Sequence, residues 1–502
     1  MPTAQEIGSP AVRAPLWPPA SPTSGNERGE ARHKVVLYNP AAVFYTMPWA
    51  LVTIASGLDP SRFRVVIVDG RLEVDSARRL VEECADAAIL GVTVLTGRPL
   101  RDALAMSRVA KAARPELPVV WGGWHPSLFP TQCLADPAVD AVVVGQGETA
   151  FSEVVERVVT GRGLAGVHGV WVKDLGGEVV PGAAGELVDL NALSPHDYGL
   201  IEVERYFRLK GNRQLDYISS QGCPYRCAFC ADPAVYNRSW TGIAAPRMLS
   251  ELLFLHQRYR LDEVALQDEL FFVNRTRALA FIDGLLAEGA PFSWTATLRA
   301  DQAARMDESV FEKLGRSRCR ELLIGVESGS PELLRRISKD IVLDQVMQAA
   351  DLCAKHGVGA RFPFIVGFPG EPPGSVWETI AVAKALRKKS QSFNISIFSY
   401  APYPGSDLYT QLEADGETPL PGDLEGWTSF DYVSSRGPWT SAATQELVDR
   451  FAFYVHHGYR AGRSPVERVV SRLARWRCER DRYEFPVEQR VIQWLRPTPA
   501  VA

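Results

Sequence analysis

Short apolar runs alternate with stretches of helical periodicity along the first third of the chain. Five runs rich in β-branched residues are predicted to be buried strands: 34–39, 64–69, 87–94, 117–121 and 139–144. Helices are predicted between or after them at 48–57, 75–85, 98–113 and 148–159. Strands that are apolar on both faces and alternate with helices indicate an α/β fold with a doubly wound parallel sheet. We assign this first domain to residues 33–160.

Glycine and threonine gather at the carboxyl ends of these predicted strands. Ligands of parallel sheets bind at that edge, and glycines there let a ligand approach the backbone closely. Any one of these glycines, taken alone, is explained more simply by a tight turn from strand to helix. Several such loops on one edge favour a binding site, whose candidate residues are Thr93, Thr96, Gly122, Gly123, Gly145 and Gly147.

A second alternating series begins near residue 215. Its predicted strands are 215–219, 263–266, 292–297, 321–325, 362–366 and 393–398, and its helices include 246–259, 275–288, 331–337 and 343–356. About six strand–helix units predict a partial (β/α)6 barrel over residues 212–410, with its active site at the carboxyl ends of the strands. Residues 161–211 are expected to form a connector that contains a hairpin around Gly176 and Gly177.

The remaining C-terminal domain, 411–502, is expected to be mainly helical and aromatic. Helices are predicted around 442–462 and 464–478. We expect its aromatic residues to close the bottom of the barrel or to shape a substrate pocket; they are Trp427, Phe430, Tyr432, Trp439 and Tyr454. Aromatic residues at such spacing more often build a core than contact a ligand.

Charge and composition narrow the functional classes. The 502 residues carry a formal net charge of -4, so no basic excess points to nucleic acid as a partner. No stretch approaches the roughly 20 uninterrupted apolar residues of a membrane helix. Residues 1–32 are rich in Pro, Ala, Ser and Gly without an apolar core, which predicts a disordered leader and a cytoplasmic protein.

Three of the eight cysteines form one compact run, Cys223-Pro-Tyr-Arg-Cys227-Ala-Phe-Cys230, directly after the first barrel strand. The other five are scattered and are most simply small buried hydrophobic residues. Three closely spaced thiolates on one loop can hold three corners of an iron–sulfur cube and leave one iron open. A structural zinc site would need a fourth ligand, and only Asp232 and His256 lie near, neither with zinc-finger spacing.

This cysteine run, with Phe229 before its last cysteine, resembles the signature of the radical S-adenosylmethionine (SAM) family. Later blocks at 325–334, 364–371 and 403–406 resemble family blocks in the family's order. The first domain resembles a flavodoxin-like cobalamin-binding domain at 91–96 and 120–126. The resemblance covers about residues 34–410 and extends to class B radical SAM methyltransferases and anaerobic magnesium-protoporphyrin IX monomethyl ester cyclases.

The resemblance implies roles for individual residues. Cys223, Cys227 and Cys230 would ligate a 4Fe-4S cluster, whose electron would cleave SAM to a 5′-deoxyadenosyl radical. Further contacts to SAM would come from Phe229 at the adenine, Asp268 and Glu269 at the methionyl ammonium, Arg299 at the carboxylate, and Glu327 and Ser328 at the ribose. Blander alternatives remain: Glu327 could cap the following helix, and Arg299 could be an ordinary surface cation.

Two departures from family patterns limit which of the family's residue roles can be carried over to this chain. Residues 39–47 replace the loop that in some relatives supplies a histidine ligand to cobalt, and they contain no histidine. His125 is the tempting substitute, although packing against Trp124 and Pro126 is the simpler interpretation. Gly370 occupies an acidic position of the family, so Glu371, which follows it, receives no role.

The leading functional hypothesis is radical C-methylation of a small molecule, with methylcobalamin as methyl donor and a second SAM to remethylate cobalt. Radical cyclisation or oxidation, as in the magnesium-protoporphyrin ester cyclases, is the close alternative. A methylthiotransferase would carry a second cysteine set in the first domain, where only Cys84 and Cys133 occur. A non-catalytic cobalamin or SAM sensor is hard to reconcile with a complete cluster loop. The resemblance also implies an electron donor such as flavodoxin or ferredoxin.

Overall fold

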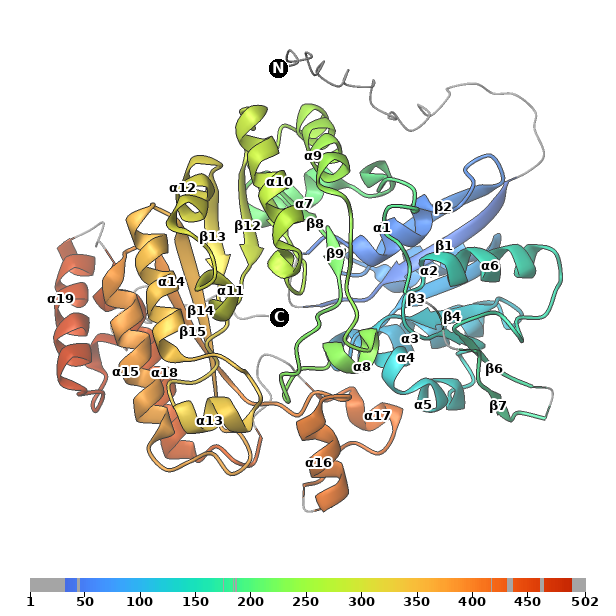
Figure 1. Ribbon diagram of the computed structural model, residues 1–502. Helices are drawn as coiled ribbons and strands as arrows, with labels where there is room; N and C mark the ends of the chain where they lie inside the picture. Colours follow the sequence, from blue (N-terminus) through green and yellow to red (C-terminus); the bar gives the residue numbers. More distant parts are fainter. Residues whose placement is uncertain are drawn as a thin grey trace, which may run out of the picture.

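The computed structural model describes residues 32–42, 46–174, 176–183, 185, 187–416, 418–430, 437–460 and 465–489. Two sheets lie side by side, and helices cover both (Figure 1). Residues 1–31 of the predicted leader and Tyr432 lie outside the described residues.

The N-terminal sheet confirms the predicted doubly wound architecture. Its five parallel strands are β1 (His33–Asn39), β2 (Phe63–Asp69), β3 (Ala87–Thr93), β4 (Val119–Gly122) and β5 (Ala141–Val143), in the order β2-β1-β3-β4-β5. The helices of this domain are α1 (Trp49–Ser56), α2 (Ser76–Cys84), α3 (Arg98–Ala113), α4 (Trp124–Leu128), α5 (Pro130–Ala135) and α6 (Glu148–Val159). Separate apolar clusters pack on the two faces of the sheet, as expected for strands buried on both sides.

The hairpin expected in the connector belongs instead to the N-terminal sheet. Its strands, β6 (Val170–Lys173) and β7 (Val179–Val180), extend the sheet beyond β5, and both of their pairings are antiparallel. The hairpin covers the edge that the short strand β5 would otherwise expose. The connector proper follows the hairpin and contains a single 3-10 turn, η1 (Tyr198–Leu200), and α7 (Val203–Lys210) among its described residues.

The second sheet confirms the predicted partial barrel. Its six strands pair in parallel in the order β15-β14-β13-β12-β11-β8. They are β8 (Gln214–Tyr217), β11 (Glu263–Leu266), β12 (Ser293–Thr297), β13 (Cys319–Leu323), β14 (Gly359–Val366) and β15 (Phe393–Ser399). The first and last strands do not pair with each other, so the barrel is open.

Helices cover one face of the barrel strands, and the other face is concave and more exposed. The covering helices are α9 (Ala245–Tyr259), α10 (Arg275–Ala287), α12 (Glu308–Arg316), α14 (Leu343–Lys355) and α15 (Ser375–Lys389). Buried Trp294, Leu322 and Phe362 alternate with residues such as Thr295 and Arg361 along the strands. Period-two alternation therefore separates a buried apolar core from an exposed concave face.

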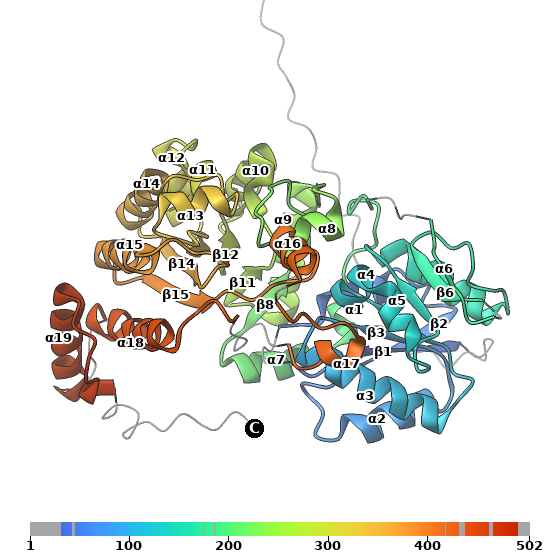
Figure 2. The same ribbon diagram turned by 90° about the horizontal axis from the view of Figure 1, so that it is seen from below.

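The C-terminal region departs from its expected position. After α16 (Asp407–Asp415), the segment returns to the N-terminal domain through α17 (Leu424–Trp427), which lies beside α3 (Figure 2). Trp427 is buried there and stacks on Phe129 at 5.2 Å between ring centroids. The expectation that Trp427 and Phe430 close the bottom of the barrel or shape its substrate pocket is therefore wrong. Trp439 and Tyr454 do pack against the barrel core, where α18 (Ala442–Gly458) lies beside β15 and α19 (Pro465–Arg480) packs on α18.

Within the described ranges, no helix combines the length and apolar character needed to cross a membrane.

The barrel core provides a direct test of this packing. Trp294 is 0 % exposed, meets Phe271 and Phe281 edge to face, and donates from Nε1 to the Ser317 carbonyl at 2.9 Å. We expect Trp294→Ala to lower the free energy of unfolding by about 3–5 kcal/mol, measured from the barrel's urea transition. Trp377→Ala, at a position 47 % exposed, is the control and should change it by less than about 1 kcal/mol. Equal effects of the two substitutions would contradict the assigned core.

Candidate functional site

The cysteine run forms a loop that leaves the end of the first barrel strand through β9 (Ser220–Gln221) and leads to α8 (Asp232–Tyr236). Gly222 adopts φ +85°, and a Cβ at this position would collide with the Ser239 carbonyl. Ala228, in the middle of the loop, donates to the Ile337 carbonyl at 2.9 Å and accepts from the Leu408 amide at 2.8 Å. The loop is therefore fixed on both sides by distant parts of the chain.

The three thiols of this cluster loop are partly buried and form no disulfide. Burial raises the pKa of Cys223 to about 11 and that of Cys230 well above its ordinary value, so thiolates here need a strong positive partner. Among the described residues, no three His, Cys, Asp or Glu side chains converge on a position for one metal ion. A four-iron cube binds its thiolates at separate corners, so its three ligands need not converge on one point.

Arg299 supplies a buried positive charge beside these thiols. It is 6 % exposed, and its Nη1 lies 3.5 Å from Cys227 Sγ. Its guanidinium carbon lies 3.7 Å from the centroid of the Tyr225 ring. Nε donates to Asp301 at 2.8 Å and Nη2 donates to the Lys339 carbonyl at 2.6 Å. The surface-cation alternative is therefore wrong, and a thiolate at Cys227 would meet a fixed cation.

Glu327 and Phe229 both lie next to the same buried lysine, Lys339. Glu327 follows β13 with φ +65°, and its Oε1 accepts from Lys339 Nζ at 2.6 Å. Lys339 Nζ lies 5.9 Å from the centroid of the Phe229 ring. Ser330 is the N-cap residue of the following helix, α13 (Pro331–Arg336), so the helix-cap alternative for Glu327 is wrong. Sequence reasoning missed Lys339, because no local pattern marks it.

Two other residues predicted to contact SAM, Asp268 and Ser328, form hydrogen bonds within the protein instead. Both oxygens of Asp268 accept hydrogen bonds from Ser219 and Ser220, at 2.6–2.7 Å. Ser328 is fully buried, and its hydroxyl accepts from the Ser330 amide at 3.0 Å. Both residues therefore hold loops at the strand ends.

Glu269, next to Asp268, is brought to the cluster loop. Its Oε2 accepts from the Gly222 amide at 3.2 Å. Burial, reinforced by nearby Asp232, raises the pKa of Glu269 to about 8. Glu269 is half-buried and lies beside the entrance to the cluster loop.

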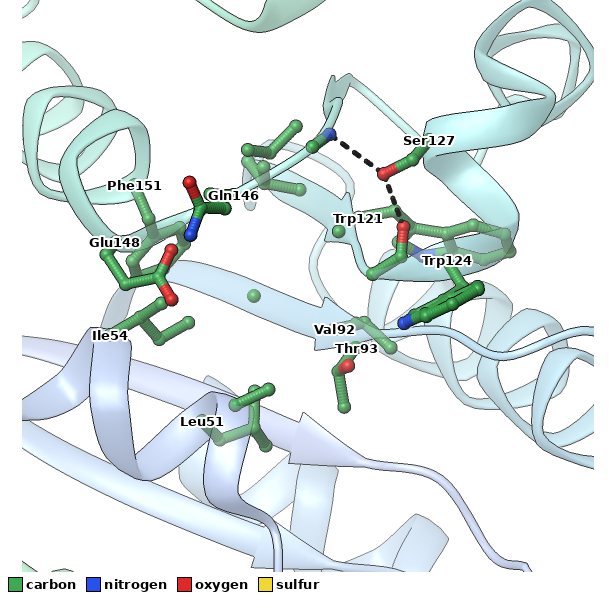
Figure 3. Close-up of a pocket in the computed structure, with 18 of the residues that line it drawn as sticks. Leu51, Ile54, Val92, Thr93, Trp121, Trp124, Ser127, Gln146, Glu148 and Phe151 are labelled. Carbon is green, nitrogen blue, oxygen red and sulfur yellow. Dashed lines mark hydrogen bonds between the residues drawn. The ribbon is translucent and has the colours of Figure 1, made fainter. Parts of the chain in front are cut away.

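A second site is a pocket at the carboxyl ends of the N-terminal strands (Figure 3). Five of the six predicted cobalamin residues line it: Thr93, Gly122, Gly123, Gly145 and Gly147. The sixth, Thr96, is not a lining residue, because it is buried with its hydroxyl 3.1 Å from His125 Nδ1. A Cβ on Gly91, also in the lining, would lie 2.8 Å from Leu37 and 2.9 Å from Phe151. The absence of side chains at the glycines keeps the crevice open.

The polar groups of this pocket include atoms without protein partners. Glu148 Oε2 and Trp49 Nε1 are buried without a hydrogen-bond partner, and both residues line the pocket. Gln221 and Tyr236, from either side of the cluster loop, complete the lining. A pocket with apolar walls, glycine edges and orphaned polar atoms fits an organic cofactor with a few hydrogen-bonding groups. Glu148 follows the predicted glycines directly but was not itself predicted.

His125 does not reach this pocket as a ligand would. It is fully buried, and its ring lies 5.3 Å from Phe129 and 6.1 Å from Trp427 between centroids. The residue is therefore packed, as expected, and these two rings are among its neighbours. Glu371 also acts structurally, since its carboxylate accepts from the amides of Gly367 and Phe368 and from the Ser375 hydroxyl.

Comparison with known families agrees with these two sites. Residues 36–155 match the B12 binding domain, and residues 217–383 match the Radical SAM superfamily. The fold and the site define a cobalamin-binding radical SAM enzyme. The chain combines the B12-binding and radical SAM domains of such enzymes, whose cofactors are a 4Fe-4S cluster, SAM and cobalamin.

Several relatives are named methyltransferases. The chain is 29% identical to an uncharacterized methyltransferase of Pyrococcus horikoshii over 79% of this chain and 87% of that protein. It is 23% identical to cytidylyl-2-hydroxyethylphosphonate methyltransferase of Streptomyces wedmorensis over 88% and 93% of the two chains. The fold is similar to that of the radical SAM methyltransferase TsrM from Kitasatospora setae, with a TM-score of 0.66, 18% identity and coverage of 78% and 77%.

The burial of His125 predicts a pH dependence of stability. Burial lowers its pKa to about 4 in the folded state, against about 6.5 in an unfolded chain. As the pH falls from about 6.5 to 4, the unfolded state binds a proton that the folded state rejects, and stability falls by up to about 1.4 kcal/mol per pH unit. Buried His196 acts in the same direction, because its pKa is lowered to about 3.

We therefore expect His125→Gln to show a shallower loss of stability between pH 6.5 and 4, measured by urea denaturation at each pH. His168 is exposed, and His168→Gln should keep the wild-type slope. An unchanged slope in His125→Gln would refute the contribution assigned to this histidine.

Proposed function

We propose that this enzyme is a cobalamin-dependent radical SAM methyltransferase that methylates carbon in a small-molecule substrate. The observation that carries the proposal is the direct contact between the two sites. Gln221 Nε2 donates to Glu148 Oε1 at 3.0 Å, and Gln221 precedes Cys223 by only two residues. A methyl carrier held in the pocket would thus adjoin the cluster loop, as methyl transfer to a radical requires.

Cys223, Cys227 and Cys230 would hold the cluster, and the glycine-edged pocket would hold part of the corrinoid. When bound, the cluster supplies the electron that cleaves SAM to a 5′-deoxyadenosyl radical, and the corrinoid supplies a carrier for a methyl group. Near the cluster loop, Phe229, Glu269 and Glu327 would contact SAM. Thr93 and the four predicted glycines of the pocket (Gly122, Gly123, Gly145 and Gly147) would contact the corrinoid.

Charged side chains are fixed in place around the cluster loop. Arg299 is held by Asp301 and by the Lys339 carbonyl, so its positive charge stays beside Cys227 without reorganisation. Lys339 holds the Glu327 carboxylate in a fixed orientation. A fixed cation favours the thiolate form that an iron ligand needs. Arg299 therefore acts in this proposal as a partner of the thiolate, in addition to any contact with the SAM carboxylate.

The concave face of the barrel would receive the substrate. Leu323 and Phe398 on this face are 38 % and 46 % exposed, and Arg361 forms an ion pair with Glu321 at 3.1 Å. Apolar and ionic groups therefore share one surface, which fits a small molecule with both kinds of group.

The proposal also needs a one-electron donor such as flavodoxin or ferredoxin. We place the reaction in the cytoplasm, where reducing conditions suit eight cysteines outside disulfides.

Radical cyclisation or oxidation is the second candidate. The chain is 26% identical to the anaerobic magnesium-protoporphyrin IX monomethyl ester cyclase of Rubrivivax gelatinosus, over 64% of this chain and 58% of that protein. The two methyltransferase relatives named above align over more of both chains. This difference in coverage supports methylation over cyclisation.

Loss of one cluster ligand should abolish SAM cleavage. After anaerobic reconstitution with iron and sulfide, we expect Cys227→Ala to lack iron–sulfur absorbance and to form no 5′-deoxyadenosine above background with SAM and a strong reductant. Cys478→Ala is the matched control, because this buried thiol lies in α19 at the far end of the molecule, and the variant should retain both properties. A fully active Cys227→Ala enzyme would contradict the cluster assignment.

The products of SAM distinguish methylation from cyclisation. We expect the reconstituted, cobalamin-loaded enzyme, incubated with a strong reductant, a small-molecule extract of its native cells and SAM carrying a deuterated methyl group, to label one extract compound. S-adenosylhomocysteine should appear together with 5′-deoxyadenosine, since one SAM donates a methyl group and another is cleaved. Mass spectrometry detects all three products. Formation of 5′-deoxyadenosine with substrate turnover but no S-adenosylhomocysteine would support cyclisation or oxidation instead.

A further inference from the structure

Exposed apolar side chains gather on the last helix, α19. Among the described residues, fourteen large hydrophobic side chains are exposed, and six of them lie between residues 466 and 487. Four belong to α19 itself, Val466, Val469, Leu473 and Trp476, and each is 43–56 % exposed. Their spacing of three, four and three residues places them on one side of the helix. We call this side the apolar strip, and a contiguous strip of this kind marks an interaction site.

A row of arginines runs beside the apolar strip. Arg468, Arg472 and Arg475 are exposed and follow one another at spacings of four and three residues, so they also share one side of the helix. At about 100° per residue, this cationic strip adjoins the apolar strip. Together with Arg460 the three arginines line a hollow whose lining includes one acidic residue, Glu479. The exposed half of α19 is therefore divided between an apolar and a cationic strip.

The position of α19 leaves both strips facing outward. Its opposite side, with Val470, Ala474 and Cys478, is buried, and the helix packs on α18. Figures 1 and 2 show α19 at the outer edge of the molecule, with no further helix or strand of the described chain beyond it. Within the described ranges, the two strips thus form an unpartnered surface.

The combination of charge and apolar area selects the partner. A second copy that paired through the same face would bring its own arginines against these. Nucleic acid would neutralise the arginines but would offer nothing to the apolar strip. The chain after residue 489 contains Arg490 and Arg496 and no acidic residue, so its sequence adds cations instead of balancing them. An anionic phospholipid surface presents phosphate groups and hydrocarbon side by side, which matches both strips.

We propose that α19 binds the surface of an anionic phospholipid membrane and lies in the plane of the interface. The apolar strip enters the boundary between headgroups and acyl chains, while the cationic strip contacts the phosphates. Trp476, with the Arg480 guanidinium carbon 5.1 Å from its ring centroid, lies at the headgroup level that tryptophan favours. This inference goes beyond the proposed function and does not depend on it, because α19 lies far from the cluster loop.

The first test concerns the cationic strip. The full-length reconstituted protein is sedimented with vesicles of phosphatidylcholine, either alone or mixed with phosphatidylglycerol. We expect binding to the mixed vesicles that weakens as salt is added, and little binding to phosphatidylcholine alone. Arg468→Gln combined with Arg472→Gln should raise the Kd about 30-fold, which corresponds to about 2 kcal/mol.

A matched pair of substitutions controls for net charge. Arg78→Gln combined with Arg316→Gln removes the same charge from exposed positions on α2 and α12. This variant should bind the mixed vesicles within about 2-fold of wild type. All four substitutions are at exposed positions, so both proteins should fold normally.

The second test measures the depth of the apolar strip. Phospholipids brominated on their acyl chains quench tryptophan fluorescence only where the indole reaches the acyl region. We expect Trp476→Phe to bind the mixed vesicles but to lose most of the quenching seen with wild type. Trp171→Phe, at a half-buried position on β6 of the N-terminal sheet, should keep that quenching.

Each remaining outcome overturns the proposal. It fails if the wild-type protein does not bind the mixed vesicles, if the two arginine pairs weaken binding equally, or if Trp476→Phe leaves the quenching unchanged. A wild-type dimer that Leu473→Ser dissociates, without vesicle binding, assigns the face to a second copy instead. Formation of 5′-deoxyadenosine without vesicles should be the same in wild type and in every α19 variant, so failure of this inference leaves the proposed function intact.

Discussion

The structure depends on the contact that Gln221 makes across the boundary between the two sheets. Its amide joins Gln146 and Glu148, at the strand ends of the N-terminal sheet, to the strand that leads into the cluster loop. Ligands of parallel sheets bind beyond the carboxyl ends of the strands, and here two such edges share one space. Neither site would adjoin the other if the sheets met along any other edge.

Buried charges concentrate where the cluster loop meets the barrel. Arg299 is balanced by Asp301, and Lys339 by Glu327, so the loop is surrounded by pairs and not by isolated ions. A buried pair of this kind gives little net stability, but it holds charges in place when a charged group arrives. The region is thus organised for binding and electrostatics more than for stability.

The periodicity of the chain was sufficient to predict both sheets, because strand alternation and helix periods are local signals. The cysteine loop was equally clear, since its spacing is written within eight consecutive residues. Long-range partners could not be predicted. The burial of Arg299 depends on Lys339, some 40 residues later, and the position of Trp427 depends on Phe129, almost 300 residues earlier. Glu148 was missed for a similar reason: only the position of Gln221 shows that one of its oxygens is satisfied and the other is not.

The return of the chain to its first domain has a mechanical consequence. The polypeptide passes between the domains three times: in the connector, before α17, and again between α17 and α18. At α17 the chain is tied to the first domain, because Arg101 donates to the Thr428 carbonyl at 2.9 Å and Arg108 pairs with Glu425 at 2.8 Å. A single linker would let the domains swing freely, whereas repeated crossings restrict their relative motion. Opening far enough to admit a bulky cofactor must then pull on the segment that Trp427 anchors in its core. Cofactor loading and the anchoring of a distant tryptophan become parts of one mechanical event.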